Sequence, residues 1–257
     1  MWRNIRIGIL LFILALAAWS NWYDRLSTTD WDETLTIGVF PIDDARDAVT
    51  QAYVGTLDNG DVADVQRFLN EEAREFGVGI AQPVNVRVYP PVAEPPPERV
   101  ADSGVLGTMW WSLKMRLYAR RASRASGLPA PQIRVFVRYH NPDFTQRVPH
   151  AVGMQKGLVG VVHAFADDEM RGGNNVVIAH EVLHTLGASD KYDPVTLAPL
   201  YPMGYAEPDR YPRFPQPFTE IMAGRRALTP VEFEMPQSLD EVIVGPATAL
   251  EVRWLRQ

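Results

Sequence analysis

The spacing of apolar residues predicts both strands and helices along most of the chain. Apolar and polar residues alternate in residues 85–89 (NVRVY) and 132–139 (QIRVFVRY), which predicts two half-buried strands. Residues 34–42 are rich in strand-forming residues and residues 158–165 form a nearly continuous apolar run, so both are expected to be strands, the second one buried. Helical spacing of the apolar residues predicts helices over residues 43–55, 61–76, 103–126 and 174–186.

Capping and breaking residues set the expected bounds of these elements. Asp61 precedes the apolar positions of the second helix and is expected to be its N-cap. Residues 90–97 hold five prolines and are expected to form an extended surface loop. Two glycines at 172–173 are expected to break the chain before the helix that starts at residue 174. Thr229, followed by Pro230, predicts the N-cap and first position of a further short helix.

The N-terminal segment is apolar enough to enter a membrane. Residues 7–18 contain no charged or strongly polar side chain, and extension to residues 5–23 gives ~19 residues, a length that crosses a bilayer as a helix. Arg3 and Arg6 precede the apolar stretch and acidic residues follow it, which predicts a single-pass anchor with a cytoplasmic N-terminus and an extracytoplasmic body. The expected organisation is an anchor over residues 1–23, a linker over 24–33 and one domain over 34–257.

A cleaved signal peptide is the alternative for the same segment. The Ala-Leu-Ala sequence at residues 15–17 matches the small-residue pattern of a cleavage site after a short apolar region. Cleavage would give a secreted protein, whereas an uncleaved anchor in a Gram-negative cell would place the body in the periplasm. Both of these interpretations put the body outside the cytoplasm, and the remaining alternative for the segment is a buried helix of a soluble protein.

Charge and cysteine content exclude several classes of function. The 257 residues include 31 acidic and 25 basic side chains, for a net charge of −6, and this balance argues against a nucleic-acid-binding protein. The chain has no cysteine, which excludes disulfides, thiolate metal sites and a cysteine nucleophile. A metal site must therefore be built from carboxylates and some of the five histidines.

One segment departs from this acidic balance. Residues 103–142 contain no acidic side chain. One interpretation is contact with an anionic membrane surface, near which the N-terminal anchor would hold the body. The simpler interpretation is a core helix with a solvated basic face, because charge runs usually only solvate a face. The basic residues of the segment are Lys114, Arg116, Arg120, Arg121, Arg124, Arg134 and Arg138.

Residues 180–190 (HEVLHTLGASD) carry the strongest chemical signal in the sequence. On a helix, residues four apart lie on one face, so His180 and His184 can present ring nitrogens to one metal ion. Gly187 accepts a positive φ and is expected to end the helix, which lets the chain return Asp190 to the metal as a third ligand. Asp193, three residues further on, is the alternative third ligand.

This ligand set predicts hydrolytic chemistry. Two histidines and one carboxylate leave a fourth coordination position for water, which is typical of a catalytic zinc site. Zinc lowers the pKa of that water towards neutrality, and Glu181 is expected to take its proton as a general base during attack on a carbonyl. Tyr192, Tyr201 and Tyr205 are candidates for a hydrogen bond to the resulting oxyanion, although packing is the simpler role for each.

The segment HEVLHTLGASD resembles the extended zinc motif of the metzincin peptidases. It matches the variant in which aspartate replaces the third histidine, and this variant is similar to the snapalysin family of small bacterial proteases. Residues 220–224 (EIMAG) resemble the metzincin Met-turn, whose methionine lies beneath the metal, and Met203 (in YPMGY) is a rival to Met222 for that place. The resemblance covers roughly residues 158–236.

The metzincin resemblance carries expectations about fold and activity. It implies an α+β zincin domain with a mixed sheet, an active-site helix and a C-terminal subdomain after Gly187. It also implies bound Zn²⁺ and peptide or protein substrates. The chain departs from the family in lacking the third histidine and an identifiable propeptide switch, so no substrate preference is implied.

Three functions are open to a chain with this motif. The first is a membrane-anchored zinc metalloendopeptidase, with His180, His184 and Asp190 as ligands and Glu181 as the base. A zinc amidohydrolase that acts on a non-peptide amide of the cell envelope would use the same chemistry. A module that holds zinc without hydrolysis is the third, but Glu181 argues against it, because a structural site needs no base.

Overall fold

The computed structural model describes residues 29–43, 47–98, 104–144, 152–154 and 158–255. The predicted membrane segment over residues 5–23, with its alternative cleavage pattern, lies outside these ranges. No helix within the described ranges is both long and apolar enough to cross a bilayer. The described part combines helices with a largely parallel sheet, in agreement with the expected mixture of α and β structure.

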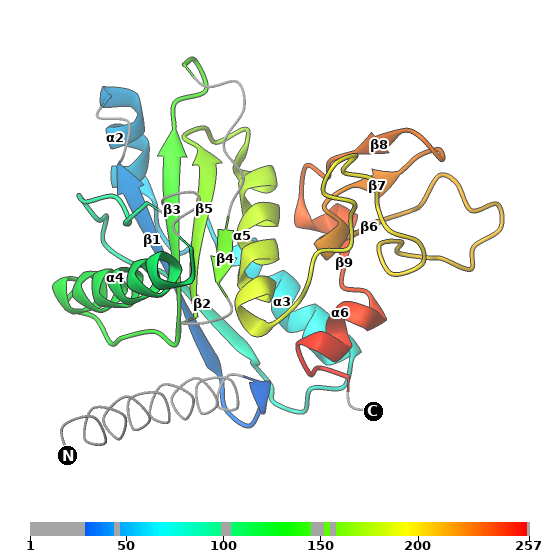
Figure 1. Ribbon diagram of the computed structural model, residues 1–257, viewed down its shortest axis with the longest axis horizontal. Coiled ribbons are helices and arrows are strands. Elements are labelled where there is room, and N and C mark those ends of the chain that lie inside the picture. The colour runs from blue at the N-terminus through cyan, green and yellow to red at the C-terminus, as the bar shows by residue number, and fades with distance from the viewer. Residues whose placement is uncertain (1–28, 44–46, 99–103, 145–151, 155–157, 256–257) are drawn as a thin grey trace.

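A five-stranded mixed sheet forms the centre of the body (Figure 1). Its spatial order is β2 (Val84–Val88), β1 (Leu35–Asp43), β3 (Ile133–His140), β5 (Val159–Phe165) and β4 (Val152–Met154). The first four strands are parallel, and β4 pairs antiparallel with β5 at one edge. Four of the strands lie where the apolar pattern predicts them, whereas β4 was not predicted, because three residues are too few to show a period.

Helices cover both faces of this sheet. The long helices agree with the predicted ones to within a few residues, and the structure adds a short helix near the C-terminus. One core joins Leu69, Val137 and Leu183, and a second core on the opposite face of the sheet joins Met115 to Phe136. The helices are α2 (Ala48–Thr56), α3 (Ala63–Glu75), α4 (Gly104–Ala125), α5 (Arg171–Leu186) and α6 (Pro246–Glu251).

The chain after α5 forms a layer of turns and short elements beside that helix (Figure 1). The buried carboxylate of Glu220 ties this layer together. Its Oε2 accepts a hydrogen bond from the backbone N–H of Ala223 (3.0 Å), and its Oε1 accepts from the N–H of Gly245 (3.1 Å) and the hydroxyl of Thr248 (2.6 Å). The short elements are β6 (Thr219–Glu220), η1 (Ile221–Ala223), β7 (Arg226–Ala227), β8 (Phe233–Glu234), η2 (Leu239–Glu241) and β9 (Val242–Ile243).

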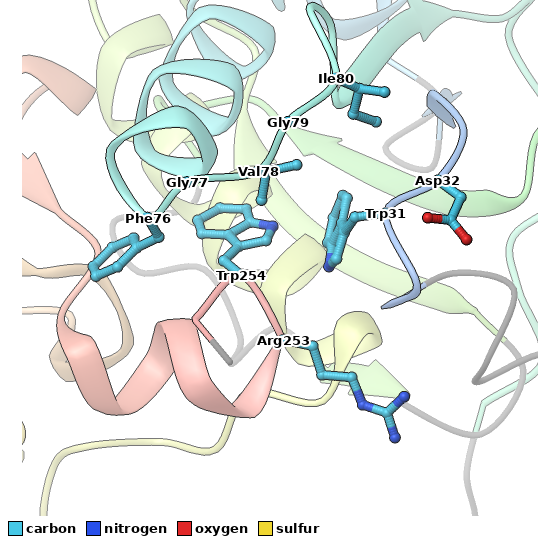
Figure 2. A pocket seen from close by; sticks show the side chains of 9 residues that line it. All are labelled: Trp31, Asp32, Phe76, Gly77, Val78, Gly79, Ile80, Arg253 and Trp254. Atoms are coloured by element: carbon cyan, nitrogen blue, oxygen red, sulfur yellow. The ribbon is translucent and has the colours of Figure 1, made fainter. Parts of the chain in front are cut away.

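The two ends of the described body meet at a pair of tryptophans (Figure 2). The rings of Trp31 and Trp254 pack edge to face with their centroids 5.8 Å apart. The indole N–H of Trp31 donates to the carbonyl of Val252 at 2.9 Å. A pocket of about 530 Å³ opens beside this pair, and Phe76 and Val78 also line it. No residue of the HEVLHTLGASD segment lines the pocket, so it is separate from the predicted metal site.

The two glycines at 172–173 do not break the chain as predicted. Helix α5 begins at Arg171, so both glycines lie in its first turn. A Cβ atom on Gly172 would lie 2.3 Å from the backbone carbonyl oxygen of Gln237. This glycine therefore allows the C-terminal layer to pack closely on the start of the helix.

Two predicted helix caps are also wrong. The N-cap of α3 is Val62, while Asp61 accepts a hydrogen bond from the N–H of Asp58 (2.8 Å) and forms an ion pair with Arg171 (3.2 Å). No helix starts at Thr229, whose hydroxyl instead accepts from two N–H groups of the turn between β7 and β8. A threonine hydroxyl stabilises a turn by the same local bonds that cap a helix, so the sequence signal was ambiguous.

A buried carboxylate on α3 gives the fold an expected pH dependence. Burial raises the pKa of Glu72 from 4.5 to about 7, although its Oε2 accepts a hydrogen bond from the N–H of Val244 at 2.7 Å. Because the folded state then binds the proton more tightly than the unfolded chain, this residue lowers stability as pH rises from about 4.5 to about 7.

Glu72→Gln keeps an acceptor for Val244 and removes the charge. We expect the variant to be more stable than the wild type at pH 8, by at most about 3 kcal/mol before solvent screening reduces the effect. At pH 4 the two proteins should unfold at nearly equal urea concentrations. An equal stability difference at both pH values would contradict this role for Glu72.

Candidate metal centre

Helix α5 presents two histidines on one face. His180 and His184 are one turn apart, and their ring centroids are 4.6 Å apart. The helix ends at Gly187, which has a φ of 112°, in the left-handed region that the sequence predicts for this glycine. The N–H of Gly187 donates to the carbonyl of His184, and the N–H of Ala188 donates to that of Leu183. This reversal turns the chain back towards the two rings.

The reversal brings Asp190 to both histidines. Its Oδ1 lies 3.4 Å from Nε2 of His180 and 3.1 Å from Nε2 of His184. Partial burial acts to raise the pKa of Asp190, but the contacts with the two rings outweigh it and hold the pKa well below its usual range. The three side chains that the sequence predicts as metal ligands therefore converge on one point.

The other ring nitrogens of the two histidines face backbone carbonyls. Nδ1 of His180 lies 2.9 Å from the carbonyl oxygen of Ile221, and Nδ1 of His184 lies 2.8 Å from that of Ala188. A carbonyl can only accept, so each Nδ1 must carry the proton and donate. In the neutral ring this leaves the Nε2 lone pair directed at the convergence point, which is how metal-binding histidines are oriented.

Glu181 lies beside the same point and is almost wholly buried, with 4% of its surface exposed. Glu181, His180 and His184 together could hold a metal ion, because one ligand atom from each side chain lies within 4.8 Å of those of the other two. Burial raises the pKa of Glu181, and the two histidines partly oppose this effect. Its buried Oε2 atom has no hydrogen-bond partner in the structure. Such an atom is costly unless another group at the site uses it.

The segment around Met222 lies directly behind the histidines. Met222 is fully buried in η1, and the preceding carbonyl, that of Ile221, is the one that accepts from His180. The carbonyl of Met222 itself accepts a hydrogen bond from the N–H of Lys191 at 2.8 Å. Met203, the rival candidate, is 50% exposed. The structure thus favours Met222 as the methionine of the predicted turn.

The residues that fix the position of the loop around Asp190 could not be predicted from the sequence pattern. The ammonium group of Lys191 is buried and donates to Oε2 of Glu251 at 2.7 Å and to the carbonyl of Ser189 at 2.7 Å. Glu251 also accepts hydrogen bonds from the N–H and hydroxyl of Ser189. Both neighbours of Asp190 are therefore fixed to α6, which positions its carboxylate.

The alternative ligand, Asp193, is engaged elsewhere. Its Oδ1 accepts hydrogen bonds from the N–H groups of Val195 and Thr196 at 2.9 and 2.7 Å, so it stabilises a turn. His140 and His163 are also separate from the site. Nε2 of His140 lies 2.9 Å from Nδ1 of His163, on the face of the sheet that α4 covers. Neither feature belongs to the cluster on α5.

Only one of the three candidate tyrosines is tied to the site. Burial and the neighbouring Asp190 carboxylate raise the pKa of the Tyr192 hydroxyl. Tyr201 and Tyr205 instead pack against each other with ring centroids 5.5 Å apart, and Arg213 lies over the Tyr201 ring. Packing therefore accounts for Tyr201 and Tyr205, and Tyr192 is the tyrosine to consider for the oxyanion.

No protein-family model matches the chain, and no curated protein sequence matches it. The metzincin resemblance thus depends on the residues of the motif.

Proposed function

We propose that this chain is a membrane-anchored zinc-dependent endopeptidase of the metzincin type, with its catalytic domain outside the cytoplasm. The observation that carries the proposal is the convergence of Nε2 of His180, Nε2 of His184 and Oδ1 of Asp190, with separations of 3.4 and 3.1 Å to the carboxylate oxygen. Ligands at about 2.1 Å around a tetrahedral zinc ion are about 3.4 Å apart, so these separations suit zinc.

The chemistry of the donors supports the same metal. Two imidazoles and one carboxylate are the ligand set of several catalytic zinc sites, and three protein ligands leave one position for water or substrate. The carbonyls that accept from Nδ1 of His180 and His184 fix both rings, as the surrounding shell of a metal site does. The orphaned Oε2 of Glu181 is a further argument, because it offers a buried acceptor where a water molecule would lie.

Glu181 is the residue that we assign to proton transfer. Zinc, when bound, supplies Lewis-acid polarisation of the substrate carbonyl and acidifies water at its open position. Oε2 of Glu181 takes the proton as the water oxygen bonds to the carbonyl carbon, and gives it to the amide nitrogen as the C–N bond breaks. Burial raises the pKa of this carboxylate, which makes it a stronger base than an exposed glutamate.

The two alternative functions differ from this proposal in substrate or in turnover. A hydrolase for a non-peptide amide of the cell envelope would use the same four residues. A module that only holds zinc would have no use for Glu181, whose burial without a partner for Oε2 costs stability. The site chemistry therefore favours hydrolysis, and the substrate has to be established by assay.

The test is digestion of a peptide library by the purified full chain, with new termini read by mass spectrometry. We expect internal cleavage that a zinc chelator abolishes and that added zinc restores. A preparation of cell-envelope amides, treated in parallel, should be left intact. Zinc-dependent cleavage of the envelope amides alone would show that the chain is an amidohydrolase and not a peptidase. If neither substrate is cleaved in a zinc-dependent way, the result would support the non-catalytic zinc module.

The third ligand can be tested with a matched pair of variants. Asp190→Asn keeps the shape of the side chain but removes the charge that offsets Zn²⁺. Loss of a residue that only supports a ligand typically lowers metal affinity roughly 10–100-fold, and loss of the ligand charge at Asp190 should lower zinc affinity by more than that. Asp193→Asn, in the same loop, should retain wild-type affinity. The opposite ranking in a competition titration would make Asp193 the ligand.

A further inference from the structure

Helix α4 buries one face against the sheet and leaves the opposite face without a protein partner in the described structure. Its buried face carries Met115, Ala119 and Ala122, which belong to the core on that side of the sheet. One side of the helix is fixed by two hydrogen bonds. The indole N–H of Trp111 donates to the carbonyl of Pro97, and the hydroxyl of Tyr118 donates to the carbonyl of Glu94. The helix is thus fixed in position, and the apolar character of its outer face is not needed to hold it there.

The outer face of α4 is apolar along its first turns. Leu106 is 81% exposed, and the exposed side chains that follow recur at helical spacing, so they share one face. Isolated exposed apolar residues are ordinary, but a contiguous stripe on one helix marks a surface that meets something else. The other members of the stripe are Met109 (62% exposed), Trp110 (61%), Leu113 (47%) and Leu117 (44%).

Basic residues continue the same face towards the end of the helix. Arg120, Arg121 and Arg124 are exposed, and by helical spacing they follow directly after Leu117 on the outer face. Lys114 is exposed beside the stripe. No acidic residue occurs from residue 103 to residue 142, so nothing on α4 itself offsets this positive charge. The sequence predicts, as its simpler interpretation, a core helix with a solvated basic face. The structure shows that this basic face continues an exposed apolar stripe on the same helix.

We propose that the outer face of α4 docks on an anionic lipid bilayer. The leucines, Met109 and Trp110 enter the boundary between headgroups and acyl chains, and the arginines bind acidic headgroups. Charge complementarity selects this occupant, because an apolar partner helix would leave the cluster of arginines without counter-charge. α4 and α5 lie on opposite faces of the sheet, so docking through α4 leaves the metal centre turned away from the membrane (Figure 1). The proposal does not depend on the peptidase chemistry.

The absence of cysteine allows a direct test in the full chain. Two variants, Leu113→Cys and Val231→Cys, are each labelled with an environment-sensitive fluorophore. Val231 is the control position, because it is 81% exposed and lies in the turn between β7 and β8. The proteins are reconstituted into phosphatidylcholine vesicles with and without phosphatidylglycerol. We expect the label at 113 to shift to the blue and to be quenched by lipid-attached quenchers when phosphatidylglycerol is present. The label at 231 should remain accessible to a quencher in water.

Removal of charge separates a lipid surface from other occupants. Each basic side chain near an anionic surface raises the ratio of docked to free protein about five-fold, so Lys114→Gln, Arg121→Gln and Arg124→Gln together should lower this ratio about 100-fold. A label at 113 that stays in water on both kinds of vesicle would overturn the proposal. So would a label that is shielded from water but not reached by lipid quenchers, because residues 7–18 or a second copy would then cover the face.

Discussion

His180→Ala or His184→Ala is expected to abolish stoichiometric zinc binding, whereas the wild-type chain should bind one zinc ion. Each histidine supplies one of the three converging ligand atoms, and its Nε2 has no substitute within reach among the described histidines. Zinc should raise the unfolding temperature of the wild type, since a ligand at 100 times its Kd stabilises the folded state by about 2.7 kcal/mol. The variants should show no such rise.

The control for this experiment is His140→Ala. His140 pairs with His163 away from α5, so its loss should leave zinc stoichiometry at one per chain. Tight binding of one equivalent by the double variant of His180 and His184 would show that the metal site lies elsewhere.

Glu181→Gln is expected to separate catalysis from metal binding. The amide preserves the shape of the side chain but cannot accept a proton from water. Turnover should therefore fall by roughly 10²–10⁴-fold, the range typical of a lost general base, or by more. Zinc content should stay near that of the wild type, and thermal stability should not fall, because Oε2 of Glu181 makes no hydrogen bond that the substitution could break.

Two outcomes would change the role of Glu181. Loss of zinc from Glu181→Gln would make this residue a ligand, which its place in the cluster with His180 and His184 permits sterically. Unchanged hydrolysis would mean that the measured activity belongs to another site or to a contaminant. The assay should use the same peptide for both proteins, at saturating concentration, so that turnover and binding are not confused.

The candidate site could be predicted from sequence because its components are local. His180, Glu181, His184 and Asp190 lie on one helix and the turn after it, so helical spacing and the left-handed Gly187 are enough to bring them together. The support of the loop is not local. Lys191 and Glu251 are 60 residues apart, and nothing in the pattern around either one indicates the other.

The fold shows the same division between local and distant information. Alternation identifies β2 and β3 and the faces of the sheet that their residues occupy, but it does not identify the neighbours of a strand or its direction. The spatial order of the strands therefore had to come from the structure. The prediction of a chain break at Gly172 is wrong because the residue that requires a glycine there, Gln237 with its backbone carbonyl, lies far along the chain.

The most direct test of the central claim is anomalous diffraction at the zinc absorption edge from crystals of the zinc-loaded protein. The account predicts one peak, about 2.0–2.2 Å from Nε2 of His180, Nε2 of His184 and Oδ1 of Asp190, with no protein atom in the fourth position. A peak at any other place, or a fourth protein ligand that closes the site, would contradict a catalytic zinc centre on α5.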